Sequence, residues 1–307
     1  MKIGLQQSLE RIASSQWFFP ISDKSTILYG CSDLVQSTLD TQSRSASLRP
    51  RRSGEYHTNI SPVKFSAGQW VDTFIPGLPK AGGFTITSAP VEAKPSSHGP
   101  GHIELAVQKS LNPPAQWLWQ PTESILGKQI AVRVGGSFIW PPPNVDVTRI
   151  TRLVLIAGGV GINPLISIFA HLIRSRSSRP REIHILYGTK ADAEMDPHRI
   201  LFLTRLMDLV AIEADPNVTL KLFLTGTGEE GRIEHGRMPN STFANRMDKT
   251  VLVKAIDGYE DYAKDGAGRS TTLCYVCGHP AMTDEFVDFL SSQQGMNPER
   301  VLCEKWW

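Results

Sequence analysis

The chain has 307 residues, of which 40% are hydrophobic and 20% charged, and its formal net charge is +2 at pH 7. This composition is typical of a globular protein with two domains of ordinary size. The near-neutral charge balance gives no reason to expect a nucleic acid or an acidic membrane surface as a partner. No apolar run is long enough to span a bilayer, so the sequence predicts a soluble protein without a transmembrane segment. The small number of cysteines favours an intracellular setting.

Residues 1–55 are the hardest part of the chain to interpret. Leu5, Leu9 and Ile12 share one helical face in the manner of a weak mitochondrial presequence, although the shortage of arginine argues against one. The candidate locations are therefore the mitochondrion and the cytoplasm. A stretch rich in Ser, Thr and Arg follows at 37–53. We expect a poorly defined N-terminal extension over 1–55, with one or two of the first strands of the next domain.

Short alternating segments separated by glycine and proline follow. The pattern predicts strands at 70–75, 84–87, 102–107 and 129–134. Several short strands between such turns are typical of a small antiparallel β-barrel, which we expect over 56–148.

The stretch after residue 150 has a different pattern. The apolar run at 153–157 is typical of a strand buried on both faces. Gly158-Gly159-Val160-Gly161 ends it, and apolar residues at helical spacing follow Pro164, a residue that suits a first helical turn. A strand, a glycine turn and a helix together direct backbone N–H groups and a positive dipole end toward one point. The spacing is G-G-x-G-x-x-P and not G-x-G-x-x-G, but the expected ligand is the pyrophosphate of a dinucleotide.

Strands and helices then alternate to the end of the chain, with a polar loop at 228–240. This order predicts a parallel sheet with right-handed crossovers, so 149–307 is expected to be an NAD(P)-binding α/β domain. The expected strands lie at 181–187, 218–224, 272–277 and 300–303, and the expected helices at 197–209 and 281–290.

The four cysteines are too few for a disulfide scaffold and fit a reducing compartment. Cys274 and Cys277 form a CxxC pair without a second pair. Their segment looks like a strand, which would send the two side chains to opposite faces of a sheet. We therefore expect no metal ion, no thioredoxin-type redox pair and no iron–sulfur centre.

Several of these segments, in this order, resemble the ferredoxin–NADP reductase superfamily. Phe65-x-x-Gly68-Gln69 is similar to its F-x-x-G-Q turn, and Gly82–Ser88 stands in the place of its R-x-Y-[ST] flavin motif. Gly158–Pro164 is similar to its G-G-x-G-x-x-P nucleotide motif, and Cys277–Met282 to its C-G-P-x-x-M motif. From about Val63 to Trp307 the chain more closely resembles a smaller group, the oxidoreductase NAD-binding domain-containing proteins.

The resemblance implies a set of site residues in each domain. Thr85, Cys277 and Glu304 are the expected catalytic residues, placed where a nicotinamide would meet a flavin. The flavin would lie along Phe84, Thr85, Ile86, Thr87 and Ser88, with Gln116 near its phosphates. Trp306 and Trp307 either cover the flavin ring or anchor the chain end between the domains. The nucleotide-binding set is Gly158, Gly159, Val160, Gly161, Ile162, Asn163, Lys190, Cys277, Gly278 and His279.

One departure from the motif affects the expected cofactors. Gly82 replaces the arginine that would contact a flavin phosphate, and losing such a contact costs roughly 1.5–3 kcal/mol. The bound flavin is therefore FAD, FMN or none that is tightly held. The nucleotide is NAD or NADP, with NADH favoured by the group resemblance and Lys190 as the residue that would favour a 2′-phosphate.

Three functions are compatible with these patterns. The first is a flavin-dependent NAD(P)H oxidoreductase that passes electrons to an unknown acceptor, such as a separate redox protein. The second is a catalytically weak or inactive NAD(H)-binding module without tightly bound flavin. The third, a dehydrogenase acting without flavin, lacks a suitable catalytic His or Tyr–Lys arrangement. The first is the one we expect.

Overall fold

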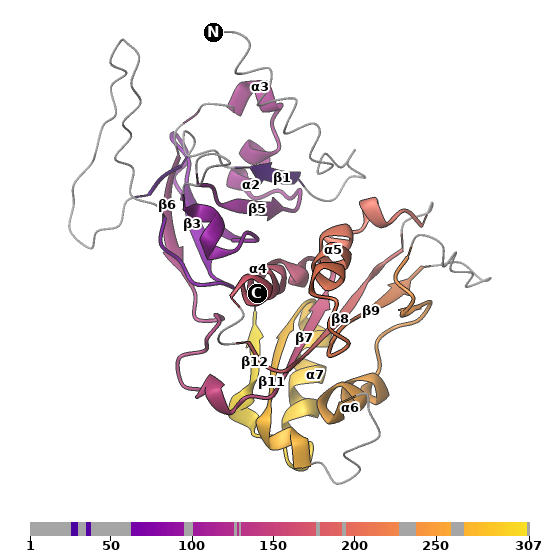
Figure 1. Ribbon diagram of the computed structural model, residues 1–307. Helices are drawn as coiled ribbons and strands as arrows, with labels where there is room; N and C mark the ends of the chain where they lie inside the picture. The colour runs from indigo at the N-terminus through magenta and orange to yellow at the C-terminus, as the bar shows by residue number, and fades with distance from the viewer. Residues whose placement is uncertain are drawn as a thin grey trace.

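The computed structural model describes residues 63–94, 101–125, 128, 130–175, 179–191, 195–226, 238–258 and 267–305, together with two short strands at 26–29 and 35–37. Two β-rich regions follow one another along the chain, an N-terminal barrel-type domain and a C-terminal domain built on a parallel sheet (Figure 1). The two-domain order expected from the sequence is confirmed.

The N-terminal domain contains two sheets. One has the strand order β2–β6–β3–β4, formed by Val35–Ser37, Ile130–Gly135, Trp70–Phe74 and Gly82–Thr85. Its β6–β3–β4 part is antiparallel, and β2 pairs with β6 in parallel. The other sheet pairs β1 (Thr26–Tyr29) with β5 (Glu104–Val107) in antiparallel fashion, and an isolated bridge from Ile86 to Leu105 links the two sheets.

Two expectations for this domain need correction. The strand expected at 84–87 is β4 at Gly82–Thr85, because Ile86 and Thr87 leave the β3 ladder and hydrogen-bond to Gln69 and Glu104 instead. Two helices that the alternation pattern did not predict, α2 (Pro113–Leu118) and α3 (Thr122–Ile125), lie between β5 and β6.

The C-terminal domain is a six-stranded parallel sheet with the order β10–β9–β8–β7–β11–β12. The first strand in the sequence, β7, is therefore internal, and the chain builds outward from it in both directions. The six strands in chain order are Arg152–Gly158 (β7), Glu182–Lys190 (β8), Val218–Thr225 (β9), Thr242–Phe243 (β10), Thr272–Cys277 (β11) and Val301–Glu304 (β12).

Helices cover both faces of this sheet. The face carrying Leu153 and Leu155 packs against α4 (Ile162–Arg174) and α5 (Leu203–Glu213), and the face carrying Val154 and Ile156 packs against α6 (Lys249–Asp257) and α7 (Pro280–Ser291). Consecutive residues of β7 alternate between the two cores because side chains of a strand alternate in direction. Cys274 and Cys277 belong to opposite cores in the same way, as the strand pattern predicted.

The structure corrects one expectation for the C-terminal domain and adds two elements to it. The helix expected from 197 begins only at Leu203, because Phe202 adopts a left-handed φ of 57° that separates α5 from a 3₁₀ turn at Pro197–Arg199. Helix α6 and the short strand β10 were not predicted. Most of the polar loop expected at 228–240 lies outside the described residues.

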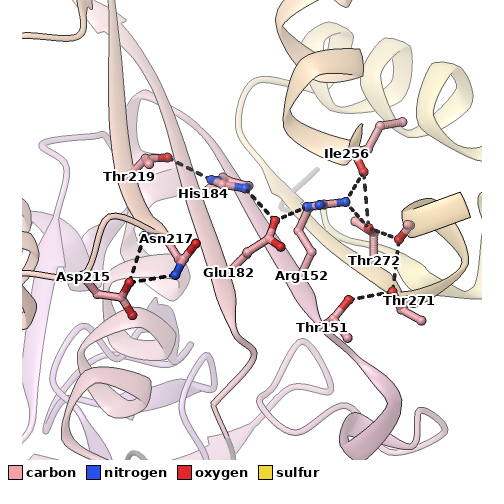
Figure 2. Close-up of polar contacts among 11 residues, drawn as sticks. Thr151, Arg152, Glu182, His184, Asp215, Asn217, Thr219, Ile256, Thr271 and Thr272 are labelled. Carbon is pink, nitrogen blue, oxygen red and sulfur yellow. Dashed lines mark hydrogen bonds and ion pairs between the residues drawn. The ribbon is translucent and has the colours of Figure 1, made fainter. Parts of the chain in front are cut away.

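A buried polar network lies at the end of the sheet where the parallel strands begin (Figure 2). Arg152, on β7, donates to Glu182 Oε2 at 2.7 Å and to the Ile256 carbonyl at the end of α6 at 2.7 Å. His184 lies 3.6 Å from Glu182 through Nε2 and 2.9 Å from Thr219 Oγ1 through Nδ1. This network joins β7, β8, β9 and α6 on the sheet edge opposite the glycine turn.

Helix α4 is buried on nearly all sides because it lies between the parallel sheet and the barrel (Figure 1). Eleven of its thirteen residues are buried, as expected for a helix that is covered on two sides. The core cluster around α4 includes Ala67, Ala89, Ala106 and Trp140 from the barrel side. The two domains therefore share one continuous apolar core.

Charged side chains cross the same junction. Arg205 on α5 contacts the barrel carboxylates of Glu104 at 2.6 Å and Glu92 at 3.4 Å, and Arg174 at the end of α4 contacts Glu92 at 3.0 Å. Thr87 donates a further hydrogen bond of 2.8 Å to Glu104. Within the described ranges, none of the helices is both long and apolar enough to cross a membrane.

Candidate nucleotide-binding and hydride-transfer site

Of the predicted site residues, the glycine turn, Cys277 and Glu304 meet at the point where the order of strands reverses. After β7 the chain adds β8 on one side, whereas β11 later pairs with the other side of β7. Ligands of open α/β sheets bind outside the carboxyl ends of the strands at such a point. Neighbouring strands place Ala157, Cys277 and Glu304 in register across this edge.

The glycine turn and the turn after β11 pack directly against each other. A Cβ added to Gly161 would lie 2.1 Å from the Cys277 carbonyl oxygen, and one added to Gly278 would lie 2.4 Å from Cε of Met282. Gly159 has a left-handed φ of 54°, and a Cβ added to it would have no heavy atom within 4 Å. The motif therefore needs glycine for two reasons: close approach of backbone at Gly161, and an open, left-handed turn at Gly159.

This geometry fits a dinucleotide. Helix α4 begins at Ile162 immediately after the turn, so its positive dipole end and free N–H groups face the carboxyl edge of the sheet. Val160 is 45% exposed at the top of the turn. Residues Gly158 to Ile162 form the turn and helix start that the motif predicted, and their contact with a nucleotide stays a prediction.

Cys277 and Glu304 lie side by side beyond the turn. Their residues pair across β11 and β12, and paired residues of adjacent parallel strands direct their side chains to the same face of a sheet. Cys277 is fully buried. Glu304 Oε2 is buried, and none of the described residues hydrogen-bonds it.

The electrostatic consequence falls on Glu304. Burial raises the pKa of its carboxyl group from the usual 4.5 to about 7. A carboxyl group in that range holds a proton in a large share of molecules near neutral pH and can release or receive it. A titratable group with such a shift at a ligand-binding edge is a candidate for proton handling.

The barrel motif residues divide into two groups. Thr87 donates to the carbonyl and the carboxylate of Glu104, and the Ser88 hydroxyl accepts the Glu104 N–H at 3.0 Å. These two side chains are fully buried and already engaged with protein groups. The hydroxyl of Thr85 makes no such hydrogen bond among the described residues, so it is the motif hydroxyl still available to a bound group. Ile86 is fully buried in the barrel core, and Phe84 packs partly buried against it.

The position that lacks the motif arginine is closed. A Cβ at Gly82 would lie 2.6 Å from Pro114 Cβ and 2.7 Å from the ring of Phe84. Helix α2, which supplies Pro114, begins with two prolines and therefore lacks two of its first N–H donors. Gln116 lies exposed on this helix, and its backbone N–H bonds the Asn112 carbonyl. The tight packing at Gly82 excludes a larger side chain.

The three other predicted nucleotide residues differ in their surroundings: Asn163 is buried at the domain junction, whereas Lys190 and His279 are exposed. Asn163 is 7% exposed and donates through Nδ2 to the Ala106 carbonyl of β5 at 3.1 Å, which ties α4 to the barrel. Lys190 ends β8 and is exposed at the carboxyl edge of the sheet. His279 is an exposed residue at the N-cap of α7, with no hydrogen bond from its side chain to that cap. Trp306 and Trp307 lie outside the described residues.

Sequence reasoning missed several residues at the site and the domain junction. Met282 fills the space between the two glycine turns, a role that its place at the end of the C-G-P-x-x-M pattern did not reveal. Ser167 and the Glu104–Arg205 pair join the two domains. Ser167 stands one turn after Asn163 in a helix rich in apolar residues, and this position could have indicated a buried hydrogen bond to another element. The Glu104–Arg205 contact spans about a hundred residues and left no local pattern.

Comparisons with known proteins agree with this geometry. Residues 155–288 match the family described as Oxidoreductase NAD-binding domain. The Oxidoreductase NAD-binding domain-containing protein 1 of Xenopus laevis is 36% identical over 253 residues, which cover 79% of this chain and 70% of the relative. The cytochrome P450 reductase GcoB of Amycolatopsis has a TM-score of 0.55 at 22% identity, covering 80% of this chain and 62% of that one. A mutant ferredoxin-NADP+ reductase from Plasmodium falciparum with 2′P-AMP has a TM-score of 0.52 at 17% identity, covering 78% of this chain and 84% of that one.

The chain thus has the two-domain fold of ferredoxin–NADP reductases, and its C-terminal domain matches an oxidoreductase NAD-binding family. Within that class, the chain belongs to the family of Oxidoreductase NAD-binding domain-containing protein 1. It spans about three fifths of the GcoB chain, so the likeness to that reductase concerns the shared fold.

Proposed function

We propose that this protein is a flavin-dependent NAD(P)H oxidoreductase, in which a nucleotide bound at the glycine turn donates a hydride to a flavin held by the barrel. The observation that carries the proposal is the meeting of Cys277, Glu304 and the glycine turn at the strand reversal, in a domain that shares an apolar core with the barrel. Electrons would then pass to an acceptor, which we propose is a separate molecule.

The residues present fit the ring of a flavin better than its phosphates. Near the ring, Thr85 offers a hydroxyl and Glu304 a buried carboxyl oxygen that no described residue hydrogen-bonds. At the expected phosphate position, Gly82 supplies no cation, and the first residues of α2 are prolines. A bound flavin would supply the two-electron acceptor for the hydride.

The chain's own residues bind, orient and handle protons. The turn at 158–161 and the start of α4 would hold the pyrophosphate of the nucleotide. Cys277, a small buried side chain at the end of β11, would leave room for the nicotinamide and set its position. Glu304 would hold the proton that accompanies reduction, since its raised pKa matches neutral pH. Water is kept from this junction by the apolar core shared between the domains.

We propose NADH as the preferred nucleotide. Lys190 is the exposed cation at the end of β8 and would be the residue to contact a 2′-phosphate. A solvated lysine on this edge supplies limited discrimination. Lys190→Ala should leave the apparent affinity for NADH within about twofold and weaken that for NADPH, measured by steady-state kinetics with both nucleotides.

A second candidate function follows from the packing at Gly82. Because Pro114 and Phe84 close this position, flavin binding would lose a charge-assisted contact worth roughly 1.5–3 kcal/mol, about tenfold to a hundredfold in affinity. The alternative is therefore an NAD(H)-binding module that retains no flavin and has little or no turnover.

The visible absorption spectrum of the purified protein separates the two. The proposed reductase shows a flavin spectrum, as isolated or after addition of FAD or FMN, that bleaches when NADH is added without oxygen. A protein that stays colourless after both flavins are added, while calorimetry shows NAD⁺ binding, is the binding module.

The role of Cys277 can be tested separately. Cys277→Ala should slow flavin reduction by NADH at least tenfold and leave the flavin dissociation constant within about threefold, because the side chain would position the nicotinamide and not the flavin. Stopped-flow absorbance gives the rate, and flavin fluorescence titration gives the affinity. Equal losses in both would contradict this role for Cys277.

Location stays a prediction. The mitochondrion and the cytoplasm are the two candidates, and the N-terminal segment on which the choice depends lies outside the described residues. Imaging of the full chain and of a variant that lacks residues 1–20 and so keeps β1 and β2, each with a C-terminal fluorescent tag, compares the two locations.

A further inference from the structure

Helix α4 carries a row of polar side chains at four-residue spacing, Asn163, Ser167 and His171, and the first two of them are buried at the junction with the barrel. Asn163 and Ser167 are four residues apart, which places them one above the other on the helix. Asn163 is 7% exposed and Ser167 is fully buried, among isoleucine, leucine and phenylalanine neighbours of the same helix. Polar groups buried in this way are costly unless they are hydrogen-bonded.

The side-chain hydrogen bonds that they make all go to the barrel, whereas Asn163 Oδ1 has no partner among the described residues. Asn163 Nδ2 donates to the Ala106 carbonyl at 3.1 Å, and Ser167 Oγ donates to the Ser88 carbonyl at 2.7 Å. The Gly68 N–H donates to Ser167 Oγ at 3.4 Å. One face of α4 is thus joined to three barrel segments: β5, the stretch after β4 that contains Ser88, and the turn at Gly68 before β3.

The residues at the two ends of these hydrogen bonds are close in sequence to the residues proposed for nucleotide and flavin binding. Gly161, which packs on the Cys277 carbonyl, is the N-cap of α4, and Asn163 follows it by two residues. On the barrel side, Ser88 follows Thr85 by three residues, and the Thr87 N–H bonds the Glu104 carbonyl on β5. A rigid helix fixed at Asn163 and Ser167 therefore holds the nucleotide turn relative to the barrel strand that carries Thr85.

We propose that Ser167 and Asn163 are positioning residues for hydride transfer: they set the place of the nucleotide-binding turn relative to the barrel. This inference rests on the proposed function for its catalytic consequence. The shared apolar core holds the domains together but is non-directional, whereas hydrogen bonds require particular distances and angles. Reacting atoms must approach to about 3–3.5 Å, and a displacement of about 1 Å can reduce the rate about a hundredfold.

The test compares nucleotide binding with the transfer rate. Ser167→Ala should leave the NAD⁺ dissociation constant, measured by calorimetry, within about threefold. It should lower the anaerobic rate of flavin bleaching by NADH at least tenfold. Ser167→Cys retains a weaker donor and should recover part of the rate. If Ser167→Ala does not fold, Asn163→Ala is measured with the same expectation.

A matched control removes a similar bond elsewhere. Thr242 is buried on β10 and donates to the Pro239 carbonyl at 2.6 Å within the C-terminal domain. Thr242→Val should change neither the NAD⁺ affinity nor the bleaching rate. A Ser167→Ala protein with the wild-type rate, or with parallel losses of NAD⁺ affinity and rate, would overturn the proposal.

A second readout does not depend on flavin. Hydrogen exchange is followed by mass spectrometry with and without NAD⁺. In the wild type, NAD⁺ should slow exchange of barrel peptides that contain Gly68 and residues 104–107, and Ser167→Ala should lose this protection while still binding NAD⁺. If wild-type protein shows no bleaching, the proposed function fails, and the exchange result alone decides the positioning role. Protection retained in Ser167→Ala overturns that role.

Discussion

Glu304 shows how one residue acquires a functional property from its place in the fold. Its side chain lies on β12 beside Cys277, and burial raises its pKa to about 7. Between pH 4.5 and 7 the folded chain binds a proton that the unfolded chain has released. The free energy of unfolding therefore falls as the pH rises through this window.

Glu304→Gln should remove this dependence. The variant lacks the titrating carboxyl group, so its melting temperature should decline less than that of the wild type between pH 5 and pH 8. The pH profile of flavin reduction should also lose an inflection near pH 7. Glu299→Gln, at an exposed carboxylate before the same strand, is the control and should keep the wild-type profile. An unchanged profile in Glu304→Gln would contradict the raised pKa.

His184 has a shift of the opposite kind. Burial, followed by the nearby positive charge of Arg152, lowers its pKa to about 4, against opposing contributions from Glu182. Lys221 also lowers it, and Thr219 hydrogen-bonds the ring. Between pH 4 and 6.5 the unfolded chain binds more protons, so the free energy of unfolding falls as the pH falls.

His184→Asn removes that titration and should lessen the acid sensitivity. When the pH falls from 7 to 4.5, the free energy of unfolding of the wild type should drop on the order of 2 kcal/mol more than that of the variant. This follows from the difference between the pKa values of His184 in the folded and the unfolded chain. Urea unfolding at both pH values measures it. His198→Asn, at an exposed histidine, is the control. Its free energy of unfolding should change between the two pH values as much as that of the wild type.

Among the elements, the β7–α4 turn depends most on one residue type. Gly161 touches the backbone of Cys277 so closely that a single methyl group has no space. Any side chain at this position must separate the turn after β7 from the turn after β11. The two turns together form the edge on which the nucleotide would lie.

Gly161→Ala should therefore weaken NAD⁺ binding at least tenfold. The added Cβ, 2.1 Å from the Cys277 carbonyl oxygen, displaces the start of α4. Calorimetry measures the affinity, and far-ultraviolet circular dichroism checks that the sheet remains folded. Gly83→Ala is the control, because Gly83 is exposed and a Cβ there meets nothing within 4 Å. Affinity unchanged in Gly161→Ala would show that the contact between the turns does not support binding.

At the scale of the whole molecule, the two domains behave as one unit in their packing. The apolar cluster around α4 continues into the barrel, and Arg205 of α5 pairs with Glu104 and Glu92 of the barrel. The Glu104 side chain is only 5% exposed. For Glu92, burial opposes ionisation, but Arg205, the Ala89 N–H and Arg174 outweigh it and lower its pKa.

Removing Arg205 should cost much more than removing a surface arginine. Arg205→Ala leaves the buried Glu104 carboxylate without its cation, which destabilises a protein by about 3–5 kcal/mol. The two domains should then unfold in separate transitions in calorimetry. Arg133→Ala breaks a 2.5 Å pair with Asp72 in which the arginine side chain is 71% exposed, and should cost at most about 1 kcal/mol. Equal costs would show that the junction pair adds no stability.

The sequence by itself determined the order of the domains, the alternating strands and the glycine turn. These features depend on local spacing: apolar residues every second or third to fourth position, and glycines where a backbone must turn or approach closely. The same local patterns were enough to place Gly158 to Ile162 and Cys277 at one end of the sheet. The start of α5 was not predictable in this way, because the left-handed φ of Phe202 carries no glycine signal.

Only the tertiary structure decided which groups meet across long stretches of sequence. Asn163 Nδ2 bonds Ala106 across the domain junction, Thr87 bonds Glu104, and Ser88 bonds Glu104 and Ser167. Hydrogen bonds and burial between distant segments leave no periodic pattern in the chain. The raised pKa of Glu304 has the same origin, since it arises from desolvation by elements that only folding brings together.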